Sequence, residues 1–224
     1  HVYIDSRIKP GVLNYADIII PGQSHEEIFF STYICHPSMA NNELSGPVVA
    51  TALIKWLLSF KNKPRYTYRF VFVPETIGSI TYLSKNLDHL KENVIAGFNL
   101  TCLGDDRCFS FVPSRHGDTL ADRVALHVLA NMDNDYIKYT WLDRGSDERQ
   151  YCAPGIDLPV VNMMRSKHGT YPEYHTSLDD FKLVTKKGLY GGFKVAKEAI
   201  TRLQKFIIPK NKITCEPQLG KRGL

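Results

Sequence analysis

Residues 27–60 read EIFFSTYICHPSMANNELSGPVVATALIKWLLSF and contain, in order, an apolar strand, a polar loop and a helix. Residues 27–35 are rich in aromatic and β-branched side chains, which is typical of a buried strand. Over residues 45–60 the apolar side chains recur at helical spacing, with Pro47 tolerated in the first turn. A strand that leads through a polar loop into a helix is the unit from which α/β folds are built.

Strands and helices alternate on both sides of this unit. Residues 12–20 predict a strand that forms a hairpin with residues 27–35, because the turn signal Pro-Gly-Gln-Ser separates them. Further strands are expected at residues 66–73, 94–103, 108–112, 136–142 and 158–164, and further helices at residues 77–90, 121–129 and 186–206. This succession predicts a mixed, mostly parallel sheet covered by helices on both faces, with the chemistry in loops at the carboxyl ends of the strands.

Composition predicts a single large core. The chain has 224 residues and is 43% hydrophobic and 23% charged. No apolar run approaches the ~18 residues of a membrane span, so no membrane partner is expected. Five cysteines without a C-x-x-C spacing indicate a reducing cytoplasm. The net charge is +5, and the basic residues form no compact patch that would predict nucleic-acid binding.

The chain divides into three parts by sequence. Residues 1–12 are interpreted as a remnant of a neighbouring or inserted domain, and residues 13–208 as the catalytic-type domain. Residues 209–224 are interpreted as a basic tail that leads to a missing C-terminal domain. A homo-oligomer is left open as the assembly state.

Four polar loops follow predicted strands, at residues 35–46, 74–79, 145–149 and 171–177. Each contains groups that are costly to bury unless they are paired or bound to a ligand. Because the carboxyl ends of parallel strands meet at one edge of a sheet, these loops are candidates for a shared site.

Six motifs in these segments occur in one order along residues 13–206. They are His36 at a strand end, Asn-x-x-Ser-Gly (residues 42–46), Glu75 with Gly78, Asn99 to Gly104, Gly-Ser-Asp (145–147) before Gly-Ile-x-x-Pro (155–159), and Tyr-His-Thr-x-x-Asp (174–179). In this order the sequence resembles the zinc-dependent aminopeptidases with a two-metal site, the group that includes the glutamate carboxypeptidases. It looks closest to an aminopeptidase-like branch whose members carry further domains. The resemblance implies a three-layer α/β/α sandwich.

The resemblance also implies roles for individual residues. His36 would bind one metal and His175 the other, and Glu75 would be the general base that takes a proton from the attacking water. The pattern fails at three positions. Asn42, Thr76 and Thr101 stand where the family has a bridging Asp, a Glu ligand and an Asp ligand.

Loss of three carboxylates favours one zinc ion over two, because two neighbouring divalent cations repel strongly unless anionic ligands offset the repulsion. One zinc could be held by His36 and His175 with a carboxylate recruited from Glu75, Asp147, Asp105 or Glu43. In the alternative interpretation, the two histidines are hydrogen-bonded loop residues.

Substrate contacts are expected from Asn42, Asp147, Arg144, Arg165 and Tyr174. The arginines, with Lys167 and Arg115, could form a cationic rim suited to an acidic substrate or a free carboxylate. In the alternative interpretations these charges are scattered in solvent, Glu75 stabilises a helix start, Asn42 caps a helix, and Asp147 joins a surface ion network with Glu148, Arg144 and Arg149.

Cys35 precedes His36, so a Cys/His nucleophile is one interpretation. We expect instead that Cys35 is buried in the core, because neighbouring side chains of a strand point to opposite faces.

The leading hypothesis is a metal-dependent hydrolase of the aminopeptidase type that cleaves an amide bond of a peptide or peptide-like small molecule. A second hypothesis is a non-catalytic small-molecule binding module on a peptidase scaffold that has lost metal ligands. A third has the same site acting on an amide or ester of a modified sugar or cell-surface precursor.

Overall fold

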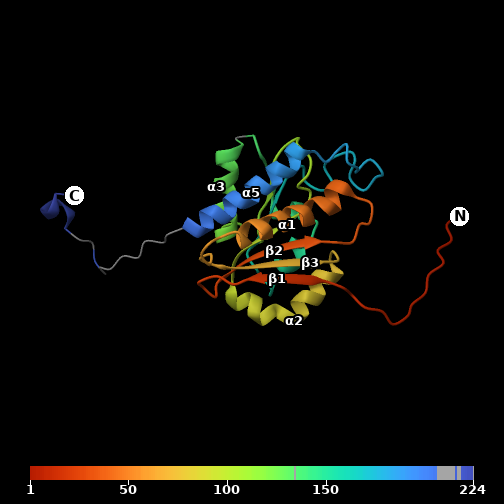
Figure 1. The fold of residues 1–224 in the computed structure, drawn as a ribbon, viewed down its shortest axis with the longest axis horizontal. Helices are drawn as coiled ribbons and strands as arrows, with labels where there is room; N and C mark the ends of the chain where they lie inside the picture. The colour runs from red at the N-terminus through yellow and green to blue at the C-terminus, as the bar shows by residue number, and fades with distance from the viewer. Residues whose placement is uncertain (134, 206–214, 216–217, 224) are drawn as a thin grey trace.

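The computed structural model describes residues 1–133, 135–205, 215 and 218–223 (Figure 1). Seven strands form one sheet in the order β1-β3-β2-β4-β7-β5-β6. The strands are β1 (Ala16–Ile20), β2 (Glu27–Tyr33), β3 (Thr67–Val73), β4 (Val94–Asn99), β5 (Ser110–Val112), β6 (Ile137–Lys138) and β7 (Val160–Met164). The α-helices are α1 (Ser45–Leu58), α2 (Ile77–Asn93), α3 (Leu120–Met132), α4 (Glu148–Tyr151) and α5 (Lys186–Lys205).

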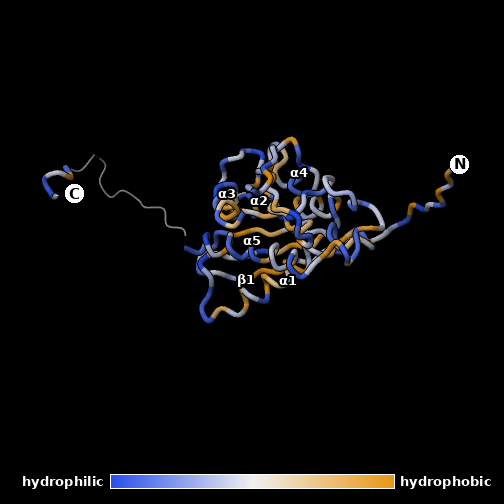
Figure 2. The backbone as a smooth tube through the Cα atoms, turned by 90° about the horizontal axis from the view of Figure 1, so that it is seen from above, coloured by the Kyte–Doolittle hydropathy of each residue, from blue (hydrophilic) through white to orange (hydrophobic). Residues whose placement is uncertain are grey.

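Helices cover both faces of the sheet, which confirms the α/β/α sandwich. Helices α1, α3 and α5 lie on one face and α2 on the other (Figure 1). The larger core packs between the sheet and helices α1, α3 and α5. A smaller core, which includes Tyr82 and Tyr151, packs between the other face of the sheet and helices α2 and α4. The hydrophobic segments run through the middle of the molecule (Figure 2). No helix in the described part of the chain is long and apolar enough to cross a bilayer.

The central strands are parallel and two pairs are antiparallel. The pairs β2 with β3, β2 with β4, β4 with β7 and β5 with β6 are parallel, whereas β1 with β3 and β5 with β7 are antiparallel. The sheet is therefore mixed and mostly parallel, as predicted.

The predicted hairpin between residues 12–20 and 27–35 was wrong, because β3 lies between β1 and β2. Every residue of β2 is buried, so this strand takes a central position with parallel neighbours on both sides, while β1 is mostly exposed and forms an edge. The intervening turn packs against the start of β3, where Gly22 N donates to Thr67 Oγ1 over 3.0 Å.

Element bounds also differ from the sequence-based expectations. The strand expected at residues 94–103 ends at Asn99, and the strand expected at residues 136–142 contains only β6 and a 3₁₀ turn. Residues 1–12 form neither helix nor strand and are exposed. The expected basic tail at residues 209–224 falls largely outside the described residues.

Helix α1 approaches the sheet closely, and this fixes the loop before it. A Cβ atom at Gly46 would lie 2.3 Å from the carbonyl oxygen of Leu100 and 2.4 Å from Thr32 Oγ1, so only glycine fits there. A buried π-helical turn, Ala40–Leu44, precedes the helix. The Asp179 carboxylate accepts hydrogen bonds from Asn41 N over 2.6 Å and Asn42 N over 3.0 Å, which ties this turn to a distant loop.

Candidate active site

His36 lies three residues beyond the end of β2, and Glu43 fixes its ring. Glu43 Oε2 accepts a hydrogen bond from His36 N over 2.7 Å and lies 3.1 Å from Nδ1 of the ring. A carboxylate at this distance favours the tautomer with the proton on Nδ1, so the lone pair of Nε2 is available to a ligand. Nε2 faces Glu75, whose Oε2 atom is 3.9 Å away. Burial raises the pKa of Glu43.

His175 lies beside His36, although 138 residues separate them in the sequence. The ring centres are 5.2 Å apart and the ring planes are tilted by 38°. His175 stacks on Tyr174, with ring centres 3.9 Å apart, and its backbone has φ of +56°, in the left-handed region. Such a conformation is costly for a residue with a side chain and is found at functional sites. The structure thus brings both histidines, Glu75 and Tyr174 to one place.

Cys35 is exposed, so the prediction that it is buried in the core was wrong. Strand β2 ends at Tyr33, and beyond it the alternation of faces no longer applies. Cys35 Sγ lies 3.3 Å from His36 Nδ1 and accepts a hydrogen bond from Glu75 N over 3.4 Å. Desolvation, with the nearby carboxylates, raises the pKa of the thiol to about 11. The donor atoms of Cys35, His36 and Glu75 all lie within 4.8 Å of one another.

Two of the three substituted positions belong to a neutral hydrogen-bond chain. Tyr33 Oη donates to Asn42 Oδ1 over 2.6 Å and lies 2.5 Å from Thr101 Oγ1. All three side chains are buried, and burial raises the pKa of Tyr33 well above its usual value. Where the resemblance implies two carboxylates, the chain therefore holds a tyrosine, an amide and a hydroxyl, none of which carries a charge.

The third substituted position, Thr76, is held by Asp147. Thr76 has φ of +64°, and its N–H donates to Asp147 Oδ1 over 2.7 Å, as does the Ser79 hydroxyl over 2.8 Å. Asp147 is fully buried, and its Oδ2 atom has no hydrogen-bond partner among the described residues. Burial raises the pKa of Asp147 to about 7. Arg149 Nη2 donates to Thr76 Oγ1 over 2.9 Å, and Asp147 and Glu148 are both buried, so the alternative in which Asp147 joins a surface ion network does not hold.

Replacement of Asp147 by asparagine should change how stability depends on pH. An acid whose pKa rises on folding stabilises the protein most below its unfolded pKa, 3.8 here, and that stabilisation is lost as the pH rises through 7. The asparagine variant cannot ionise, so its free energy of unfolding should improve relative to the native protein from pH 5 to pH 8. Denaturant titrations at both values test this, with exposed Asp118→Asn as the control. A difference that does not change with pH would contradict the prediction.

The two arginines expected to contact a substrate also have contacts within the protein. Arg165 is buried, donates from Nε to the carbonyl oxygen of Asp105 over 2.7 Å, and lies over the Phe109 ring. Arg144 is exposed and stacks on Trp141, 5.0 Å from the ring centre. A buried guanidinium needs partners inside the protein, and Arg165 has them in Asp105 and Phe109.

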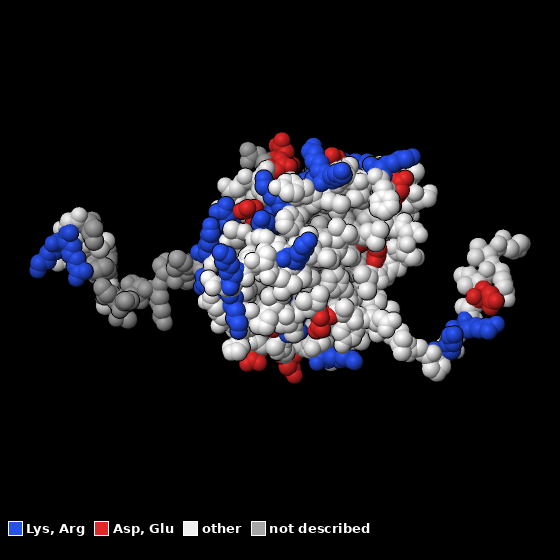
Figure 3. Space-filling view, viewed as in Figure 1, with Lys and Arg blue, Asp and Glu red and all other residues white. Residues whose placement is uncertain are grey.

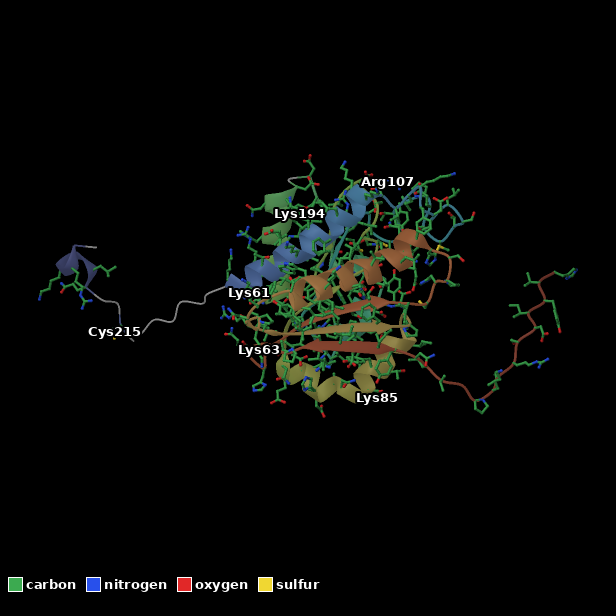
Figure 4. The ribbon with its side chains drawn as sticks, in the orientation of Figure 1. Lys61, Lys63, Lys85, Arg107, Lys194 and Cys215 are labelled. Atoms are coloured by element: carbon green, nitrogen blue, oxygen red, sulfur yellow. The ribbon has the colours of Figure 1, made fainter. Side chains whose placement is uncertain are left out.

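Positive charge gathers instead at another part of the surface. Lys and Arg side chains cluster at the edge of the molecule where α5 ends, near Lys61 and Lys63 (Figures 3 and 4). These lysines line a groove with Trp56 and Phe60 before the start of β3, at the amino-terminal edge of the sheet. Arg115, which was expected in the cationic rim of the site, forms an ion pair with Asp157.

Sequence reasoning missed the roles of three residues. Tyr33 is hidden in an apolar strand, where an aromatic residue is normal, so nothing marks its hydroxyl as a partner of Asn42 and Thr101. Glu43 was only one of four candidate carboxylates, and its seven-residue separation from His36 gives no sign of the ring contact. Asp179 belongs to a quoted motif, but its bonds to the loop backbone depend on tertiary structure.

Comparison with known proteins places this geometry in a family. The family model described as a domain of unknown function (DUF4910) matches residues 5–205. A Clostridium acetobutylicum protein, provisionally described as a polysaccharide biosynthesis protein with an aminopeptidase-like domain, is 43% identical over 228 residues, covering 100% of this chain and 51% of that protein. The chain thus spans about half the length of the curated relative that it matches.

Two solved structures share the fold. A crystal structure from Clostridium acetobutylicum, provisionally described as a peptidase, has a TM-score of 0.83 at 41% identity and covers 93% of this chain and 49% of that one. A zinc aminopeptidase from Bacillus subtilis has a TM-score of 0.64 at 20% identity and covers 84% of this chain and 49% of that one. At that identity the likeness shows the fold alone, and it confirms the aminopeptidase-like architecture.

Proposed function

This chain belongs to the DUF4910 family, and from that premise we propose that it is a metal-dependent hydrolase of the aminopeptidase type. It would cleave an amide bond of a peptide or peptide-like small molecule. The observation that carries the proposal is the approach of two imidazoles and one carboxylate, from His36, His175 and Glu75, at the carboxyl ends of β2 and β3.

The separation of the two histidines fits a shared zinc ion. Zinc–nitrogen bonds are about 2.1 Å and a ring nitrogen lies about 1 Å from the ring centre, so two imidazoles on one tetrahedral zinc have ring centres about 5 Å apart. The ring centres of His36 and His175 are 5.2 Å apart. The Glu43 carboxylate, 3.1 Å from Nδ1 of His36, would hold the ring in the orientation that a metal ligand needs.

A bound zinc would act as a Lewis acid that polarises the carbonyl of the scissile amide. His36 and His175 would hold it as neutral imidazoles, and Glu43 would keep the ring of His36 in place. Glu75 is half-buried beside His36, with its Oε2 atom 3.9 Å from Nε2. Its carboxylate would take the proton from that water and pass it to the departing amine.

One ion is favoured over two by the neutral chain through Tyr33. A second divalent cation would meet the uncharged side chains of Asn42 and Thr101, which offer no charge to offset its repulsion from the first. We therefore expect about one zinc per chain.

Metal analysis combined with an activity assay tests the proposal. Purified protein should retain about one zinc per chain and hydrolyse aminoacyl amides, and His36→Ala should lose both the metal and the activity, because a shared ion loses one of its two imidazoles. Exposed His25→Ala is the matched control. If the native protein retains no metal and stays inactive with added Zn²⁺, Co²⁺ and Mn²⁺, the proposal fails.

A non-catalytic binding module is the second candidate, and the neutral residues at the three substituted positions favour it. A binding module would hold a small molecule in this polar site without metal and without turnover. In that case Asn42→Asp, Thr76→Glu and Thr101→Asp together should not raise the zinc affinity. If only ligands have been lost, the same three changes should raise it.

The substrate class has a second candidate as well. The Clostridium acetobutylicum relative is described in terms of polysaccharide biosynthesis, so an amide or ester on a modified sugar belongs in the assay beside aminoacyl amides.

The five cysteines are free, which agrees with a protein that acts in a reducing cytoplasm.

A further inference from the structure

A sulfur atom lies beside His36, one of the two side chains that would hold the metal. Cys35 Sγ is 3.3 Å from His36 Nδ1 and beside the backbone of Glu75, and the donor atoms of the three residues fall within 4.8 Å of one another. It is the one group of three or more such donors found among the described residues. Thiolate and imidazole are the ligands that zinc sites in proteins use most.

We propose that Cys35 is the anionic ligand of the metal that His36 and His175 hold. The ion would then have one thiolate, two imidazoles and one open position, which is the ligand count of a catalytic zinc site. The proposal rests on the proposed function only in assuming that the site binds a metal. Neither the family description nor the named relatives assign a metal to this cysteine.

A divalent cation held by His36 and His175 needs an anionic ligand. The positions that would supply carboxylates hold Asn42, Thr76 and Thr101, so two imidazoles alone would leave a divalent cation uncompensated at its ligands. A thiolate from Cys35 supplies one negative charge in the first coordination shell. Glu75 then remains free to move protons instead of binding the ion.

The sulfur of Cys35 lies close to the ring of His36. Zinc–sulfur bonds are about 2.3 Å and zinc–nitrogen bonds about 2.1 Å, so a sulfur and a nitrogen on one tetrahedral zinc lie about 3.6 Å apart. The sulfur lies 3.3 Å from Nδ1 of His36, the nitrogen that faces Glu43, and the donor atoms of Cys35, His36 and Glu75 fall within 4.8 Å of one another. As a ligand on the Nε2 side of that ring, Cys35 would change its side-chain rotamer, and rotation about the Cα–Cβ bond moves the sulfur by up to about 3 Å between staggered positions.

A thiolate ligand can be seen directly by spectroscopy. Cadmium and cobalt bound to sulfur give a charge-transfer absorption in the ultraviolet that imidazole and carboxylate ligands do not give. The full chain, freed of metal and titrated with Cd²⁺ or Co²⁺, should show this absorption up to about one equivalent. Cys35→Ser should lose it and bind zinc at least about tenfold more weakly. Cys35→Asp keeps an anion, so it should recover affinity without the absorption.

Two variants serve as controls. Cys215→Ser removes an exposed thiol on the C-terminal segment beyond α5 and should keep the absorption (Figure 4). Glu75→Gln should also keep it, because Glu75 is not expected to bind the ion. Charge-transfer absorption that survives Cys35→Ser, or stoichiometric Cd²⁺ binding without that absorption, would overturn the assignment and leave the proposed function intact. A normal absorption without any hydrolysis would instead support the ligand and count against the hydrolase.

Discussion

Glu75→Gln should lower kcat for hydrolysis of an aminoacyl amide by about 10³-fold, within the range that general acid–base groups contribute. Glutamine has nearly the same shape as glutamate but cannot accept a proton. Glu75 lies 3.9 Å from His36 Nε2 and also carries the backbone N–H that contacts Cys35, and the side-chain change leaves that N–H in place. Steady-state kinetics and zinc content, measured on the same preparation, test the prediction.

The zinc content separates two roles for this carboxylate. If Glu75 is the base, the glutamine variant keeps its zinc and loses turnover, with KM little changed. If zinc is lost together with activity, Glu75 is a ligand and the base lies elsewhere. Exposed Glu26→Gln should match the native protein in both measurements.

Arg69→Met should destabilise the fold by about 3–5 kcal/mol, the cost of removing one partner from a buried ion pair. The Arg69 guanidinium is 6% exposed and donates to both carboxylate oxygens of Glu27, over 2.6 and 2.9 Å, and to Tyr82 Oη over 3.1 Å. Asp17 lies 3.5 Å from the same group. Without Arg69, Glu27 stays buried and keeps, among the described residues, the exposed His89 as its ion-pair partner. Urea denaturation measures the loss.

A double variant distinguishes an unpaired charge from a loss of packing. Arg69→Met with Glu27→Leu removes both charges from the interface between β2 and β3, so it should recover most of the stability. If the double variant is as unstable as the single one, packing of the arginine stem, not the orphaned carboxylate, accounts for the cost.

Local patterns predicted most of the fold. The apolar strand and the helix in residues 27–60, and the long helix at residues 186–206, have strong periodicity and appear close to the expected bounds. Strand pairing was harder to predict than the strands themselves. Residues 12–20 and 27–35 form a hairpin only if no other strand lies between them in the sheet, and β3 does. The fully buried β2 takes a central place in the sheet, and β3 supplies its second parallel neighbour.

The sequence predicts which loops form the candidate site, but it does not predict how the side chains of those loops contact one another. Loops at the carboxyl ends of parallel strands meet, so His36, Glu75 and His175 could be placed together from sequence. The orientation of Cys35 depends on where β2 ends, within two residues, which periodicity does not resolve. The inward turn of Arg165 depends on partners that only the folded chain brings near.

Anomalous scattering from crystals at the zinc absorption edge is the most direct measurement of a single metal at this site. We expect one peak, between the rings of His36 and His175 and within bonding distance of both. Two peaks a few ångströms apart, a peak at other residues, or no peak in crystals soaked with zinc would contradict a mononuclear centre held by these two histidines.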